Sequence, residues 1–212
     1  IEKKMNKSIP TAGVRVNEDG YFEMVYNPDF FEPLTDKQRT GVLVHEFYHL
    51  VFEHVTGRLP DELAGVMTSA KPSPEEAQKF KLWNIAADLS INWHIGAGNL
   101  PEKCCIPGGP MFEDMPGDKT AEWYYDKLIQ KVEEQEQDGA QGEPGDEDGD
   151  GQGGGSGTPG NQPFDPDAAG QFDDHGEWGE GQANEVAQEA LDIAKERLKE
   201  AMKDAATEAS SK

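Results

Sequence analysis

The sequence has few cysteines, few basic side chains and no long apolar run, and each shortage excludes a class of protein. Its two cysteines, Cys104 and Cys105, are adjacent, a spacing that suits neither a structural zinc site nor an ordinary disulfide. We therefore expect reduced, inert thiols and a cytoplasmic location. No run of about 18 apolar residues occurs, so no segment is expected to cross a membrane. No secretory signal is visible either.

Basic residues are outnumbered: 19 Lys and Arg stand against 42 Asp and Glu among 212 residues, for a formal charge of −23. A surface of this sign repels phosphate groups, so we expect no nucleic-acid partner and no binding to an anionic membrane surface. Much of the acidic excess lies in the polar second half of the chain, so it indicates little about a substrate.

One pentapeptide carries specific chemistry. His45, Glu46 and His49 form an H-E-x-x-H pattern. In a helix the two histidines lie one turn apart on one face, so both imidazoles can bind one Zn²⁺ while Glu46 addresses a water at the metal. The pattern predicts a zinc hydrolase in which Glu46 is the general base.

The surrounding sequence predicts a buried helix over residues 36–56. Thr35 and Gln38 form a capping box at its start, and Gly57 supplies a stop. A glutamate buried between two histidines is costly unless a metal or a proton compensates its charge. Apolar residues surround the helix almost completely: Val42, Leu43, Val44, Phe47, Tyr48, Leu50, Val51, Phe52 and Val55.

A catalytic zinc usually has three protein ligands, and Asp88 is the best candidate for the third. It lies in a predicted helix over residues 74–95, which a capping box opens and a glycine follows. Asn84, Asp88 and Asn92 recur every four residues and form a polar stripe in an apolar setting. We predict that Asn84 and Asn92 orient Asp88 or the histidines. The alternative is that this stripe faces solvent.

Other polar residues near these helices have less specific interpretations. On a continuous helix His54 lies about 180° from His45, so we expect it to be structural or near the rim of the site. His94 is expected in the core or at the rim. Tyr124 and Tyr125 could place a hydroxyl near the metal, but core packing is the simpler interpretation.

Several motifs follow one another across roughly residues 10–130: Tyr26-Asn27-Pro28, the H-E-x-x-H pattern with His54, Trp83-Asn84-Ile85-Ala86-Ala87-Asp88 with Ile91-Asn92, Leu100-Pro101, and Ala121-Glu122 with Tyr125. In these motifs the sequence resembles a metallopeptidase family of bacteria and phages, within the zincin group. The domains of that family commonly precede a von Willebrand A-like domain. The resemblance implies an α+β zincin-like fold, a Zn²⁺ cofactor and a peptide or protein substrate.

The chain departs from that family in one respect. It has no downstream D-x-S-x-S metal site, and it begins at Ile1 rather than at a methionine. We therefore expect either a short variant or the front part of a longer protein, with a possible C-terminal domain or partner missing from this chain.

Composition divides the chain into four parts. Residues 1–137 are expected to form the α+β metallopeptidase domain, with a hairpin over 13–26 and a helix from residue 121 to about 137. Residues 138–163 have no large apolar side chain and are typical of an acidic, Gly-rich linker. Residues 164–182 are expected to dock on a surface, and 183–212 to contain a C-terminal helix.

The docking segment contains His175 among Phe164, Phe172 and Trp178, a composition unusual for a polar tail. One hypothesis is that it covers the catalytic cleft, where His175 is an inhibitory fourth ligand or an oxyanion stabiliser. Simple docking elsewhere on the surface is the alternative.

These observations together predict a zinc-dependent metallopeptidase that hydrolyses peptide bonds through a metal-activated water. Two alternatives remain. One is a catalytically inactive zincin-like metal-binding scaffold. The other is an acidic protein-interaction module with a basic partner.

Overall fold

The structure is a computed structural model with an α+β architecture, a small three-stranded sheet and several helices. It describes residues 1–55, 57–63, 72–102, 104–140, 164–166, 168–169 and 188–211. The elements in chain order are β1 Glu2–Met5, β2 Ala12–Val16, β3 Phe22–Tyr26, α1 Pro28–Phe31, α2 Asp36–Val51, η1 Asp61–Leu63, α3 Pro74–Ile95, η2 Ala97–Asn99, α4 Ala121–Ala140 and α7 Gln188–Ser210.

The predicted hairpin is confirmed. Strands β2 and β3 pair antiparallel with Val14 opposite Met24, and Gly20 has a φ of 71° in the turn between them. That backbone conformation favours glycine, which has no Cβ to clash. Strand β1 was not expected; it pairs parallel with β3, so that the strand order is β1-β3-β2.

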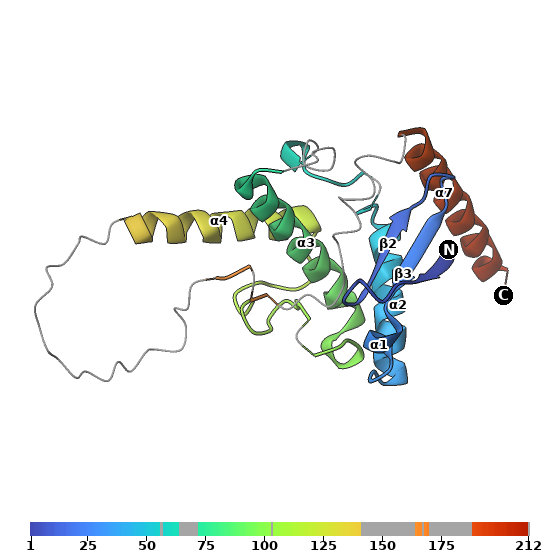
Figure 1. Ribbon diagram of the computed structural model, residues 1–212, viewed down its shortest axis with the longest axis horizontal. Coiled ribbons are helices and arrows are strands. Elements are labelled where there is room, and N and C mark those ends of the chain that lie inside the picture. Colours follow the sequence, from blue (N-terminus) through green and yellow to red (C-terminus); the bar gives the residue numbers. More distant parts are fainter. Residues whose placement is uncertain are drawn as a thin grey trace, which may run out of the picture.

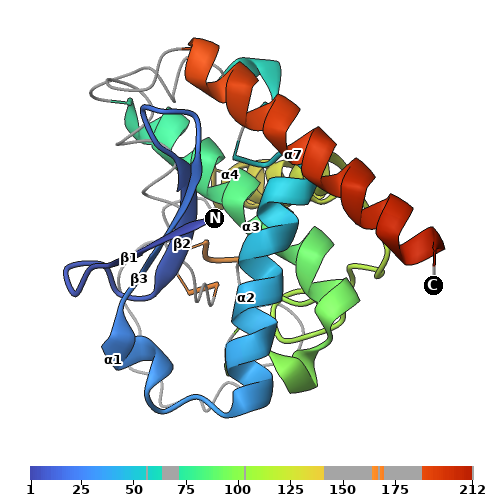
Figure 2. The same cartoon turned by 90° about the vertical axis from the view of Figure 1, so that its right-hand side faces the viewer.

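The helices form successive layers beside this sheet. The sheet packs on α2, α3 lies on the other side of α2, and α4 packs across α3 and runs away from the sheet (Figure 1). Helix α7 crosses near the C-terminal end of α2 (Figure 2). One apolar cluster fills the space between sheet and α2, and includes Val14, Val42 and Leu50. A second joins α3 to α4 through Trp83 and Leu128.

Helix α2 begins as predicted but ends earlier, and it is buried on one face only, because Leu43 is 49% and Phe47 43% exposed. The Thr35 and Gln38 capping box is present, yet the helix stops at Val51 rather than near residue 56. Glu53 adopts a left-handed conformation with φ of 60°, and its N–H donates to the Leu50 carbonyl. The N–H of His54 donates to the His49 carbonyl, which completes a Schellman motif. Glutamate occupies the position that glycine usually takes, so the predicted stop at Gly57 was wrong.

Helix α3 has the predicted bounds. Ser73 and Glu76 form its capping box, and Gly96 follows it with a φ of 82°. Residues 82–92 are all buried, because α2 covers one side of the helix and α4 the other. The stripe of Asn84, Asp88 and Asn92 is therefore not a solvent-facing surface.

A backbone contact fixes the separation between α2 and the end of α3. A Cβ built on Gly41 would lie 1.8 Å from the carbonyl oxygen of Asn99, in the short η2 turn that follows α3. Only a residue without a side chain permits this approach. Gly41 lies one helical turn before His45, so the contact holds the helices together next to the predicted ligands.

The second half of the chain is described only in part. Helix α4 extends to Ala140, beyond the predicted end, and α7 spans Gln188–Ser210 within the predicted 183–212 region. Phe164 is 8% exposed and packs edge-on against Phe112, with ring centroids 6.0 Å apart. Residues 138–140 of the predicted 138–163 linker belong to α4, and its residues 141–163 lie outside the described residues, as do Phe172, His175 and Trp178.

Candidate metal centre

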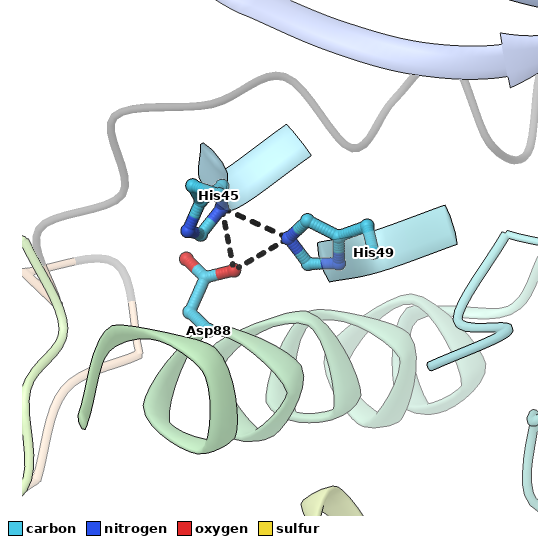
Figure 3. Close-up of side chains that lie close together, drawn as sticks. All are labelled: His45, His49 and Asp88. Carbon is cyan, nitrogen blue, oxygen red and sulfur yellow. Dashed lines mark hydrogen bonds and ion pairs between the residues drawn. The ribbon is translucent and has the colours of Figure 1, made fainter. Parts of the chain in front are cut away.

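His45, His49 and Asp88 converge between α2 and α3. Figure 3 shows the two imidazole rings from α2 facing the carboxylate that rises from α3. Asp88 Oδ1 lies 3.6 Å from His45 Nε2 and 3.5 Å from His49 Nε2. The two Nε2 atoms are 2.9 Å apart. One ligand atom from each residue therefore points at a common centre, and the three residues could hold a metal ion.

The size of this triangle fits a small divalent cation. Two ligand atoms that each lie about 2.0–2.2 Å from a tetrahedral ion are separated by roughly 3.4 Å. The two carboxylate-to-imidazole distances match that separation. The shorter separation of the two Nε2 atoms is a hydrogen-bond distance, and an ion between them requires only that the rings move slightly apart.

Burial also favours a cation. His45, His49 and Asp88 are 0% exposed, and Glu46, which follows His45 on α2, is 2% exposed. Removing a carboxylate from water costs several kcal/mol unless a positive charge compensates it. Two carboxylates and two imidazoles buried together form a donor set that a divalent ion would stabilise.

Asn92 determines which nitrogen of His45 faces the centre. The Asn92 side-chain amide donates through Nδ2 to the Cys105 carbonyl at 2.8 Å, which fixes its orientation. Its Oδ1 can then only accept, and it lies 2.8 Å from His45 Nδ1. The proton of a neutral His45 is therefore on Nδ1, and the Nε2 lone pair points toward the centre.

His54 does not lie where the sequence placed it. Because α2 ends at Val51, the chain turns back, and His54 Nδ1 lies 3.1 Å from His49 Nδ1. His54 is 3% exposed, so it is a buried neighbour of the site rather than part of a rim. No sequence signal marked this contact, since the turn contains glutamate instead of glycine.

The structure also describes four other residues that the sequence singled out: Asn84, Tyr124, Tyr125 and His94. Asn84 is 7% exposed, and its Oδ1 has no hydrogen bond within the part of the chain that the structure describes. The Tyr124 hydroxyl donates to the Pro116 carbonyl, and that of Tyr125 to Glu62, so both side chains serve packing and not the metal centre. His94 is exposed at the end of α3. The position of His175 lies outside the described residues.

Polar contacts beside the second core cluster tie residues 57–63 to α4. Arg58 Nη2 donates to Glu122 Oε2 at 2.9 Å. Burial alone would raise the pKa of Glu122, but hydrogen bonds, chiefly from Arg58, lower it below its ordinary value. Burial and the neighbouring Glu62 raise the pKa of Tyr125, which keeps its hydroxyl protonated as a donor. These contacts hold residues 57–63 against the first turns of α4.

The fold and this cluster define an α+β domain with a candidate metal site on two packed helices. The chain belongs to the family described as "Putative metallopeptidase domain", whose model matches residues 7–211 and so includes α7. Neither a curated protein nor a solved structure was found to match the chain. No helix within the described residues is long and apolar enough to cross a bilayer.

Proposed function

We propose that the protein is a zinc-dependent peptidase of the zincin group, in which His45, His49 and Asp88 hold the ion. The observation that carries this proposal is the convergence of two imidazole nitrogens and one carboxylate oxygen in a fully buried site. Membership of a metallopeptidase family supports the same conclusion. Catalytic zinc is typically bound by three nitrogen or carboxylate ligands, which leave a fourth coordination position for water or substrate.

The chemistry divides between the ion and the chain. When bound, Zn²⁺ supplies Lewis acidity, which lowers the pKa of water toward about 7 and polarises the scissile carbonyl. Glu46 takes the proton of the attacking water and later delivers it to the leaving amine. Glu46 directly follows His45 on α2 and is 2% exposed, which supports this role. Low exposure keeps bulk water away and strengthens these charge interactions.

The proposal is tested first by the metal content of the purified protein. We expect about one zinc per chain in the wild type, and its loss in His45→Ala and Asp88→Ala. Elemental mass spectrometry measures both. A Glu46→Gln variant should retain zinc but lose cleavage of a peptide library, because it removes only the base.

Other outcomes favour the alternatives. Zinc retention without any Glu46-dependent cleavage would favour a metal-binding scaffold, an alternative that the complete burial of the three ligands also supports. A wild-type protein without metal, whose binding to basic partners weakens steeply with salt, would favour an acidic interaction module.

A further inference from the structure

The turn that follows α2 brings a third histidine, His54, against His49 of that helix. His54 Nδ1 lies 3.1 Å from Nδ1 of His49, on the side of that ring opposite the nitrogen that faces Asp88. Both rings are almost completely buried. His54 therefore contacts His49, a proposed ligand, through the ring nitrogen that the metal would not use.

The backbone of the Schellman motif produces this contact. In such a motif the second residue after the helix cap packs against a residue in the last turn, and the two are usually apolar. Here those positions are His54 and His49, joined also by the hydrogen bond from the His54 N–H to the His49 carbonyl at 3.0 Å. The apolar contact is replaced by a pair of imidazoles.

The surroundings hold His54 in this orientation. Its ring lies edge-on to Trp83 with centroids 6.0 Å apart, and 5.9 Å from the ring of Phe52. The left-handed backbone of Glu53, which precedes it, is strained for a residue with a Cβ. A strained residue persists only where the surrounding contacts determine the conformation.

One proton must lie between the two Nδ1 atoms. Two lone pairs or two N–H groups would repel at 3.1 Å, so one nitrogen donates and the other accepts. Without an ion, the 2.9 Å separation of the His45 and His49 Nε2 atoms requires a proton between them, on His49 Nε2. If an ion takes both Nε2 lone pairs, the His49 proton is on Nδ1 instead, and His54 Nδ1 is the acceptor. Asn92 Oδ1 has the same relation to His45 Nδ1.

We propose that His54 is a positioning residue of the metal centre. By accepting a hydrogen bond from His49 Nδ1, it orients the His49 ring and keeps the Nε2 lone pair directed at the ion. Each ligand histidine would then have its own fixed acceptor, Asn92 for His45 and His54 for His49. This inference rests on the proposed metal site.

The test measures zinc affinity by competition with a chromophoric chelator. His54→Phe retains a ring beside Trp83 but has no acceptor, and we expect its affinity to fall about 10- to 100-fold. His54→Asn places an amide oxygen near the former Nδ1 and should recover most of the loss. His94→Phe is the matched control, because His94 is an exposed histidine of α3 whose ring contacts Tyr48 and Phe52 and, among the described residues, none of the three proposed ligands; the zinc affinity of this variant should be unchanged.

The outcomes separate this inference from the proposed function. Wild-type affinity in His54→Phe would overturn the positioning role and leave the zinc site intact. A wild type that binds no zinc would overturn both.

A second measurement needs no variant and determines directly which Nδ1 atom carries the proton. In the zinc-loaded wild type, nitrogen-15 NMR should show the His49 proton on Nδ1, with a coupling across the hydrogen bond to an unprotonated His54 Nδ1. A proton on Nδ1 of His54 would contradict the proposal even if the affinities agree, because a residue that only packs places no demand on this proton.

Discussion

At the scale of single residues, the orientation of Asn92 is fixed by groups that cannot reverse their roles. The Cys105 carbonyl can only accept a hydrogen bond, so the amide nitrogen of Asn92 faces it and the amide oxygen faces His45. A buried amide with both ends bonded cannot turn over without losing two hydrogen bonds. The tautomer of His45 thus depends on a carbonyl that lies 13 residues beyond Asn92 in the chain.

Replacing Asn92 should therefore weaken metal binding. We expect Asn92→Leu, which is similar in volume but has no acceptor, to lower zinc affinity about 10- to 100-fold. Chelator competition measures the change. Ser90→Ala provides the control on the same buried stretch of α3, since within the described residues the Ser90 hydroxyl donates to the Ala87 carbonyl and contacts no proposed ligand. Equal losses in both variants would mean that affinity reflects the stability of α3 and not the bond to His45.

Residue spacing predicted that His45 and His49 share a face, because both lie within one regular helix, and the polar stripe in the apolar sequence of α3 predicted Asp88 as their neighbour. The same reasoning misplaced His54, since it extended α2 past its true end. Local patterns determine which side chains share a helix face. They do not determine where a chain turns when the turning residue is an ordinary one such as Glu53.

At the scale of elements, the turn that ends α2 makes all its backbone hydrogen bonds but has glutamate at a position that favours glycine. Glu53 has the left-handed conformation that glycine adopts at little cost, and its N–H and that of His54 complete the hydrogen bonds of the motif. The starts of α2, α3 and α4 contain no such conflict. Thr35, Ser73 and Thr120 each accept a hydrogen bond from the third helical residue, so these starts were predictable from sequence.

The substitution Glu53→Gly should stabilise the protein. Removing the Cβ relieves about 1–2 kcal/mol of backbone strain, and the greater freedom of glycine in the unfolded chain offsets part of this, so a net gain of about 0.5–1 kcal/mol is expected. The midpoint of urea unfolding measures it. The same replacement inside an exposed helix, Glu134→Gly in α4, should have the opposite sign and cost about 1 kcal/mol. A loss of stability in Glu53→Gly would show that its side chain contributes more than its backbone costs.

At the scale of the whole molecule, α7 joins the last part of the chain to the first hairpin. Arg197 Nη1 donates to the carbonyls of Asp19 at 2.9 Å and Gly20 at 2.8 Å, and its guanidinium lies 3.8 Å from the ring centroid of Tyr21. Ala190 and Ala194 are buried on the inner side of α7, whereas residues 201–211 are exposed. Contacts between such distant segments, like the pairing of β1 with β3, leave no periodic signal in the sequence, so neither was predicted.

We expect Arg197→Ala to loosen α7 from the hairpin. The loss of two hydrogen bonds and a cation–π contact at a partly exposed position should lower the free energy of unfolding by about 1–2 kcal/mol. It should also increase hydrogen exchange at residues 188–198. Lys199→Ala is the control, because within the described residues the Lys199 side chain hydrogen-bonds to the exposed Glu196 of the same helix and not to the hairpin; this change should stay within about 0.5 kcal/mol. Unchanged exchange in Arg197→Ala would mean that the buried alanines alone fasten the helix.

Gly41 has a further consequence for the ions that the site can accept. The distance between α2 and α3 limits how closely Asp88 can approach the two imidazoles, and the contact of Gly41 with Asn99 sets that distance one turn away. Ions differ in the length of their bonds to nitrogen and oxygen, from about 2.0 Å for Zn²⁺ to about 2.5 Å for Ca²⁺. Gly41, which has no side chain, would thereby limit the radius of any ion that His45, His49 and Asp88 could hold.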